Sequence, residues 1–82
     1  MVLVALTPEK EVYQGEIKSV KVPGSTGQFE ILKGHAPIVA SLTNGEVRII
    51  DTSDNVSTFN ISKGFIEVLN DEVSLLIQSM DE

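Results

Sequence analysis

His35 is the single histidine of the chain and the first residue to test for chemistry. One histidine does not make a metal site alone, and the acidic residues lack the spacing of metal ligands. A catalytic base also needs a nucleophile and an orienting partner, and no sequence signature supplies them. The setting Gly34-His35-Ala36-Pro37 instead favours a structural histidine that bonds to loop backbone, or a contact residue. Because the chain has no cysteine either, we expect no catalytic residue, metal site or cofactor.

Gly24 and Gly27 are the next candidates, since closely spaced glycines can cradle phosphate. They lie in a turn between two predicted strands, with no helix behind them to hold an anion. Neither the dinucleotide-binding fingerprint nor the P-loop pattern is present. We therefore interpret both glycines as turn residues that permit positive φ angles.

Length and charge narrow the function further. The 82 residues suffice for one domain, and the net charge of −6 argues against nucleic-acid binding. The whole excess of negative charge lies in residues 36–82, which contain eight acids and two bases. This half of the chain forms either a solvated acidic surface or a site for a basic partner. No stretch approaches the ~20 apolar residues that span a bilayer, and the N-terminus lacks a charged region followed by a long apolar region, as a signal peptide has. We expect a cytosolic, unprocessed domain over residues 1–78 with a frayed tail at 79–82.

Short β-rich runs alternate with turn signals along the whole chain, and no segment keeps a 3.6-residue period. This pattern predicts an all-β sandwich or flattened barrel. The inward-facing residues change parity between Ile17 and Val20, which predicts a bulge or a strand crossing between sheets. Asn44-Gly45 predicts a two-residue hairpin. The expected strands cover residues 2–6, 16–22, 28–32, 38–42, 46–51, 56–61, 65–69 and 73–77, and the expected bulky core members are Phe29, Phe59 and Phe65.

The apolar run from Ile38 to Ala40 has two interpretations. It is either a core strand or a partly exposed strand that offers a docking patch, the usual meaning of contiguous apolar surface.

Four stretches carry a resemblance to a known family: Thr7-Pro8-Glu9-Lys10 followed by Val12-Tyr13-x-Gly15-Glu16; Val20-x-Val22-Pro23-Gly24-x-x-Gly27-x-Phe29-x-Ile31-Leu32-x-Gly34-His35-Ala36-Pro37; Gly45-x-Val47-Arg48-Ile49; and Gly64-Phe65-x-Glu67-Val68. In this order they resemble the N-terminal domain of the epsilon subunit of F-type ATP synthases, called delta in mitochondria. The resemblance runs over nearly the whole chain, from Leu3 to about Ile77.

The resemblance implies a ten-stranded sandwich of two five-stranded sheets. It also implies a non-catalytic rotor subunit of the central stalk, which docks the gamma subunit to the membrane c-ring during proton- or sodium-driven ATP synthesis. Such a subunit lies at the cytoplasmic face of the energy-transducing membrane, peripheral to it, with no small-molecule ligand on this domain.

Two contact surfaces follow from the resemblance by position. The residues expected to face the gamma subunit are Thr7, His35, Ala36, Pro37, Ile38, Val39 and Ala40. Those expected to contact the c-ring are Gly24, Gly27, Gln28, Phe29 and Glu30. The family commonly has an acid where Gln28 stands and a small residue where Glu30 stands. We expect this displacement to place the charge on the opposite face of an extended segment.

Members of the family typically continue into two C-terminal helices, whereas this sequence stops near Glu82. It is expected to be a naturally short form or one cut at the domain boundary, so ATP binding and helix-mediated inhibition are not assigned to these residues. Alternatives are a lipoyl- or biotinyl-type carrier domain and an adaptor β-sandwich. Lys63 is the only carrier candidate and lacks the flanking residues of such a site. Carbohydrate platforms need tryptophan and tyrosine, and the chain has only Tyr13.

Overall fold

The computed structural model describes the backbone of residues 1–81 and the side chains of residues 1–80. This part of the chain is built from strands alone, and none of it is a helix that could cross a membrane. The strands are β1 (Val2–Leu6), β2 (Glu11–Gly24), β3 (Gly27–Leu32), β4 (Ile38–Leu42), β5 (Gly45–Asp51), β6 (Val56–Leu69) and β7 (Glu72–Asp81). The predicted all-β class is confirmed.

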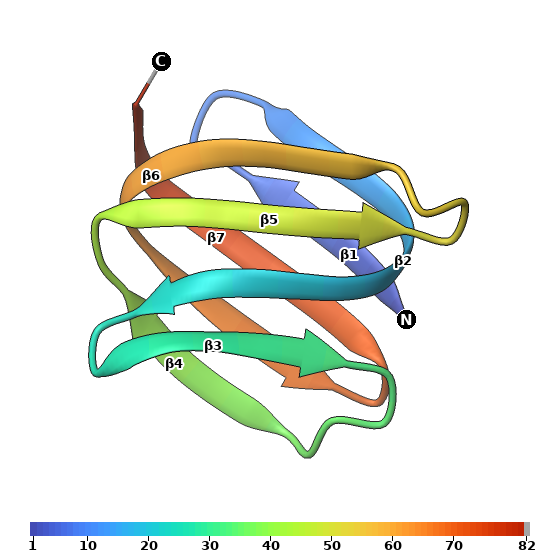
Figure 1. The fold of residues 1–82 in the computed structure, drawn as a ribbon. Coiled ribbons are helices and arrows are strands. Elements are labelled where there is room, and N and C mark those ends of the chain that lie inside the picture. The colour runs from blue at the N-terminus through green and yellow to red at the C-terminus, as the bar shows by residue number, and fades with distance from the viewer. Residues whose placement is uncertain (82) are drawn as a thin grey trace.

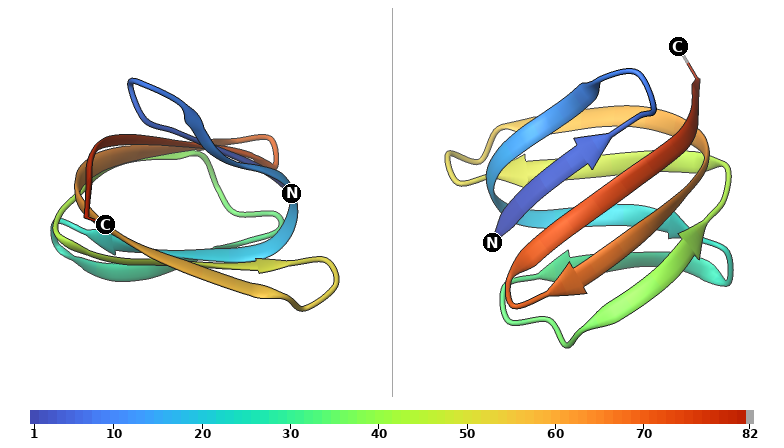
Figure 2. Two further views of the ribbon diagram at one scale, coloured as in Figure 1. Left: turned by 90° about the horizontal axis from the view of Figure 1, so that it is seen from above. Right: turned by 180° about the vertical axis from the view of Figure 1, so that it is seen from behind.

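The strands form two layers that face each other (Figures 1 and 2). The front layer holds β3, the second half of β2, β5, the first half of β6 and the end of β7. The back layer holds β4, the second half of β6, β7, β1 and the first half of β2, where β1 and β7 are the parallel pair. Apolar side chains from the inner faces of both layers fill the space between them.

Two long strands pass from one layer to the other. In β2 the pairing with β5 shifts register between Ile17 and Ser19, where the sequence predicts a bulge or crossing. In β6 the pairing with β7 shifts around Lys63, so the expected strands 56–61 and 65–69 are one continuous strand with a bend. A bulge bends its strand and raises its twist, which allows one strand to serve both layers.

These crossings explain the strand count. Residues 1–81 contain seven continuous strands, but β2, β6 and β7 each pair in both layers. Counted layer by layer, they supply the two five-stranded sheets that the resemblance implies.

The core is aliphatic. Its buried members come from every strand: Leu3, Ala5, Ile17, Val20, Val22, Ile31, Leu42, Val47, Ile49, Ile61, Ile66, Val68, Val73, Leu75 and Ile77. Phe29 and Phe59 are partly buried against this cluster, as expected. The expectation is wrong for Phe65, which is 42% exposed, because Ile66 and Val68 take the inward positions of β6.

Two further expectations differ from the structure. Asn44-Gly45 does not form a hairpin, because β4 and β5 both pair with β6 rather than with each other. The chain instead crosses there from the back layer to the front layer, and the Thr43 N–H donates to the carbonyl of Pro23 at 2.8 Å. Residues 79–81, expected to fray, continue β7, and Met80 packs against the core. Glu82 lies outside the described residues.

Candidate docking surfaces

The loop between β3 and β4 contains His35 and is ordered by a tight turn. The His35 N–H donates to the carbonyl of Leu32 at 3.1 Å, and Gly34, third in this turn, has a φ of +82°. A type II turn demands a positive φ at that place, which glycine adopts readily. The Nδ1 of His35 lies 2.6 Å from the carbonyl oxygen of Ala36. Since a carbonyl only accepts, Nδ1 carries the proton, and His35 bonds to loop backbone as the sequence suggests.

The strand that follows combines both interpretations of the Ile38–Ala40 run. Ile38 and Ala40 are partly buried and pack against the core. Val39, between them, points outward and is 71% exposed. Ala36 and Pro37 are exposed at the start of the strand. The expected gamma-facing stretch therefore offers its loop residues and Val39 to a partner, and uses the alternate positions to hold the sandwich.

Thr7 lies in the turn after β1, whereas His35 lies in the loop before β4. The Thr7 hydroxyl oxygen accepts the N–H groups of Glu9 at 3.3 Å and Lys10 at 3.1 Å, so it stabilises that turn. The structure does not bring Thr7 and His35 into one cluster.

The outer face of the back layer carries a set of exposed apolar side chains. In register, Phe65 of β6 lies opposite Leu76 of β7, and Leu76 lies opposite Leu6 of β1. We call the whole set the apolar outer face; its members are Leu6, Val39, Phe65, Leu69 and Leu76, between 37% and 71% exposed. Side chains directly opposite each other in a sheet are near enough to touch, so Leu6, Leu76 and Phe65 form one apolar row. Val39 lies opposite Glu67, and Leu69 lies opposite Glu72.

Sequence reasoning missed four of these five residues. Strand parity would have found them: Ile66 and Val68 point inward, so Phe65 and Leu69 point outward. The same alternation exposes Leu76, which lies between the buried Leu75 and Ile77.

Two open depressions flank this surface. One, of about 440 Å³, is lined by Leu6, Thr7, Pro8, Phe65, Leu76, Ile77 and Gln78. The other, of about 320 Å³, is lined by Pro37, Ile38, Val39, Glu67, Val68 and Leu69. Thr7 and the loop before β4 thus border opposite ends of the outer face of the back layer, on which Glu67 and Ser74 lie between the two depressions.

The β2–β3 hairpin holds the residues expected to contact the c-ring. A Cβ on Gly24 would lie 2.5 Å from the carbonyl oxygen of Gly27 and 2.6 Å from the ring of Phe29, so only glycine fits. Gly24 is buried and Phe29 partly buried, while Gly27, Gln28 and Glu30 are exposed. Gly27 has a φ of +135°, so the positive φ expected of both glycines applies to Gly27 alone.

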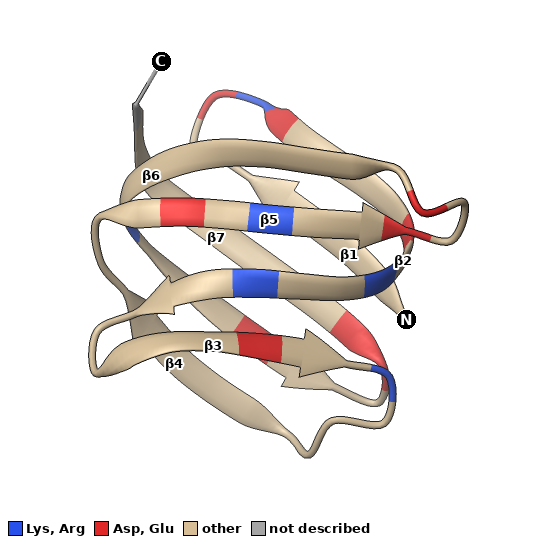
Figure 3. Ribbon diagram, in the orientation of Figure 1, with Lys and Arg blue, Asp and Glu red and all other residues tan. Residues whose placement is uncertain are grey.

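The expectation for the displaced acid is wrong. Gln28 and Glu30 are two positions apart in β3, so both point to the same, outer face. Glu30 lies in register with Lys21 of β2, which in turn lies in register with Arg48 of β5. The charge bands on β2, β3 and β5 in Figure 3 belong to this mixed polar face of the front layer. On the outer face of the back layer, Glu67 and Glu72 stand beside the apolar side chains.

The hairpin and the His35 loop lie at opposite ends of β3 (Figure 1). The structure therefore keeps the two expected contact regions apart, and one rigid strand fixes their separation.

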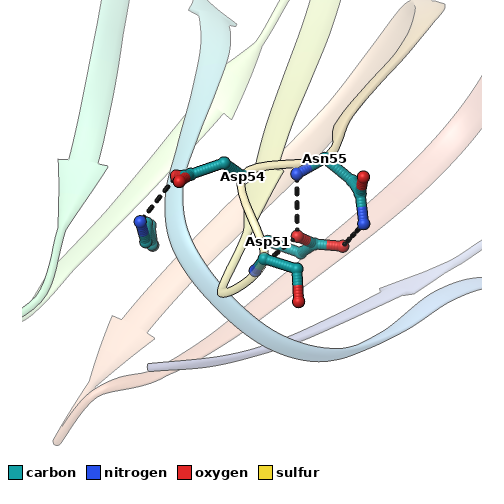
Figure 4. A network of polar contacts seen from close by, with 5 residues as sticks. Asp51, Asp54 and Asn55 are labelled. Atoms are coloured by element: carbon teal, nitrogen blue, oxygen red, sulfur yellow. Dashed lines mark hydrogen bonds and ion pairs between the residues drawn. The ribbon is translucent and has the colours of Figure 1, made fainter.

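The loop between β5 and β6 contains a network of polar contacts (Figure 4). Oδ1 of Asp51 accepts the N–H groups of Asn55 at 2.9 Å and Ser53 at 2.8 Å. Lys18 Nζ lies 2.5 Å from Asp54 Oδ1. The pKa of Asp51 is lowered, first by the hydrogen bond from the Asn55 N–H and less by the Ser53 N–H, the Asn55 side chain and the Lys18 charge. Partial desolvation acts in the opposite direction and raises the pKa. This arrangement closes a hairpin and needs no ligand.

Other candidate chemistry is not supported. Within residues 1–80, His, Asp and Glu side chains nowhere gather in threes in a way that could hold a metal ion. Lys63 lies within β6, opposite Ser79, and not at the hairpin tip that a carrier lysine requires.

Comparisons with known proteins agree with the all-β fold. Residues 1–82 match the family described as ATP synthase, delta/epsilon chain, β-sandwich domain. The chain is 43% identical over 75 residues to the ATP synthase epsilon chain of Chlorobaculum tepidum, an alignment that covers 92% of this chain and 85% of that one.

Two solved structures share the fold. A chain of the Euglena gracilis mitochondrial ATP synthase, solved with OSCP and the c-ring, matches with a TM-score of 0.87 at 19% identity, over 94% of this chain and 49% of that one. A chain of the Tetrahymena thermophila central stalk and c-ring matches with a TM-score of 0.83 at 19% identity, over 99% of this chain and 65% of that one. The chain thus spans about half to two thirds of these structural relatives.

Proposed function

The chain belongs to the delta/epsilon chain β-sandwich family of ATP synthases, and we propose from this premise that it is a rotor subunit of the central stalk of an F-type ATP synthase. In this role it docks the gamma subunit to the membrane c-ring and moves with both during ion-driven ATP synthesis. It contributes contacts to a rotary enzyme complex and no catalytic residue of its own. It lies at the cytoplasmic face of the energy-transducing membrane and is held there through its partners.

The apolar outer face is the observation that carries the proposal. Five large apolar side chains on one side of a small sandwich are costly to leave in water. Three of them, Leu6, Leu76 and Phe65, lie side by side in register, and contiguous apolar surface of this kind marks interaction sites. We assign this face and the adjoining loop, His35 to Pro37, to the gamma subunit. Thr7 borders the same face at its far end.

The c-ring side is assigned to the β2–β3 hairpin. Its exposed residues are polar, with Gln28 and Glu30 on one outer face, which suits the polar loops of a c-ring. The packing of Phe29 on Gly24 supports the hairpin from below and keeps its backbone in one conformation. Because β3 joins this hairpin to the His35 loop, the domain is a rigid spacer between two partners.

Binding to purified gamma subunit tests the proposal. We expect Val39→Asn to weaken binding, because Val39 is 71% exposed on the assigned face. Val56→Asn is the matched control: Val56 is 52% exposed, lies in β6 of the front layer and is outside the assigned surface. No binding by the folded wild-type domain, or equal loss with both variants, would refute the assignment.

A further inference from the structure

The loop of residues 33–37 is tethered to the rest of the fold by a single polar contact among the described residues. The Gly34 N–H donates to Oδ1 of Asp71 at 2.7 Å, across 37 positions of sequence. The other hydrogen bonds of the loop are local, from His35 to Leu32 and to Ala36. Within residues 1–80, the Asp71 carboxylate is thus the one polar group beyond the loop and its flanking strands that holds the loop by a hydrogen bond.

Asp71 is itself well placed to act as an anchor. It is the second residue of the β6–β7 turn, in which Asn70 and Asp71 have φ angles of 50° and 59°. Positive φ at both central residues is the two-residue hairpin geometry that matches strand twist, and Asn and Asp tolerate it. The carbonyl of Asp71 also accepts the Val2 N–H at 3.0 Å. The acceptor thus stands on a turn that is fixed to β1, β6 and β7.

The contact is not needed to satisfy a buried donor. Gly34 is exposed, so water could solvate its N–H at little cost. What the contact adds is a charged acceptor, which makes a stronger hydrogen bond than a neutral one. Its effect is to select one orientation of the loop.

We propose that Asp71 is a positioning residue, whose carboxylate holds the loop in the orientation in which His35, Ala36 and Pro37 meet the gamma subunit. The inference rests on the proposed function. A loop that spends only a fraction of its time in the competent orientation binds more weakly by that fraction. Asp71 thus contributes to docking, although it does not itself lie in the assigned contact stretch.

Three variants separate positioning from folding. Asp71→Gly removes the acceptor while relieving the positive φ, so it does not strain the fold. Asn70→Gly makes the same backbone change one residue earlier, at a side chain with no hydrogen bond within residues 1–80. Asp71→Asn keeps a side-chain oxygen and the tolerance of positive φ, and serves as the conservative rescue.

We measure the affinity for purified gamma subunit and the amide proton resonance of Gly34. Asp71→Gly should weaken binding by about tenfold, the scale of one hydrogen bond to a charged group, and should shift the Gly34 resonance. Asn70→Gly should leave both unchanged, and Asp71→Asn should recover most of the affinity.

The outcomes distinguish the two claims. If wild type binds the gamma subunit and Asp71→Gly binds equally well, the positioning role is wrong and the proposed function stands. If Asp71→Gly and Asn70→Gly weaken binding alike, the turn acts through general stability and the positioning role is also wrong. If folded wild type does not bind, the proposed function fails and this inference fails with it.

Discussion

Phe65 lies directly opposite Leu76 in the β6–β7 ladder, and both side chains point out of the sandwich, 42% and 49% exposed. The adjacent positions, Ile66 and Leu75, also face each other and are fully buried. The two strands therefore present an apolar pair on each of their faces. The inner pair belongs to the core, and the outer pair is available to a partner.

Substitution of neighbouring leucines should separate these two roles. Leu75→Ala should destabilise the domain by about 2–5 kcal/mol, because it leaves a cavity in a packed core. Leu76→Ala should cost about 1 kcal/mol or less, because that side chain is already half in water. Urea unfolding of both variants measures the difference, and similar large losses would mean that the outer face is part of the fold's own core.

Gly24→Ala should destabilise the β2–β3 hairpin. The new Cβ would meet backbone at 2.5 Å, the carbonyl oxygen of Gly27, and would also press on the ring of Phe29. Overpacking of this kind costs about 1–3 kcal/mol. Thr26→Ala, at an exposed position of the same turn, is the control and should change stability by roughly 0.5 kcal/mol or less. Thermal unfolding compares them, and a neutral Gly24→Ala would contradict the close approach.

The contribution of Asp51 should depend on pH in one direction. Its pKa is lowered in the folded protein, first by the Asn55 N–H, so its stabilising effect is present above the unfolded-state value of roughly 3.9. The effect should disappear as pH falls through the lower folded-state value. Asp51→Asn should therefore be less stable than wild type at neutral pH, and the difference should shrink under acid conditions. A difference that grew on acidification would contradict this sign.

Much of the fold follows from local alternation in the sequence. The inward positions of β6 and β7 are readable from Ile66, Val68 and Leu75, and the layer crossing of β2 from the parity change after Ile17. The hairpin predicted from Asn44-Gly45 does not form, because a turn signal reports only local backbone geometry, whereas the pairing partner of β4 is set by the core.

The candidate site was predictable only in part. The family resemblance located the His35 loop and Val39, and parity exposes Phe65 and Leu76 once the strands are known. The contact between Gly34 and Asp71 joins two turns far apart in sequence, so no local pattern contains it. Such contacts depend on how the two layers close, which only the three-dimensional structure gives.

The chain has no cysteine, so single-cysteine variants can map its partners directly. Leu76→Cys reports the apolar outer face and Gln28→Cys reports the hairpin, while Val56→Cys serves as an unassigned reference. Thiol labelling rates are compared for the free domain, its complex with gamma subunit, and the complex that also contains the c-ring. The account predicts that gamma subunit slows labelling at position 76 alone, and that the c-ring additionally slows it at position 28. Unchanged labelling at position 76 in the gamma complex, or protection of position 56 in its place, would contradict the central claim.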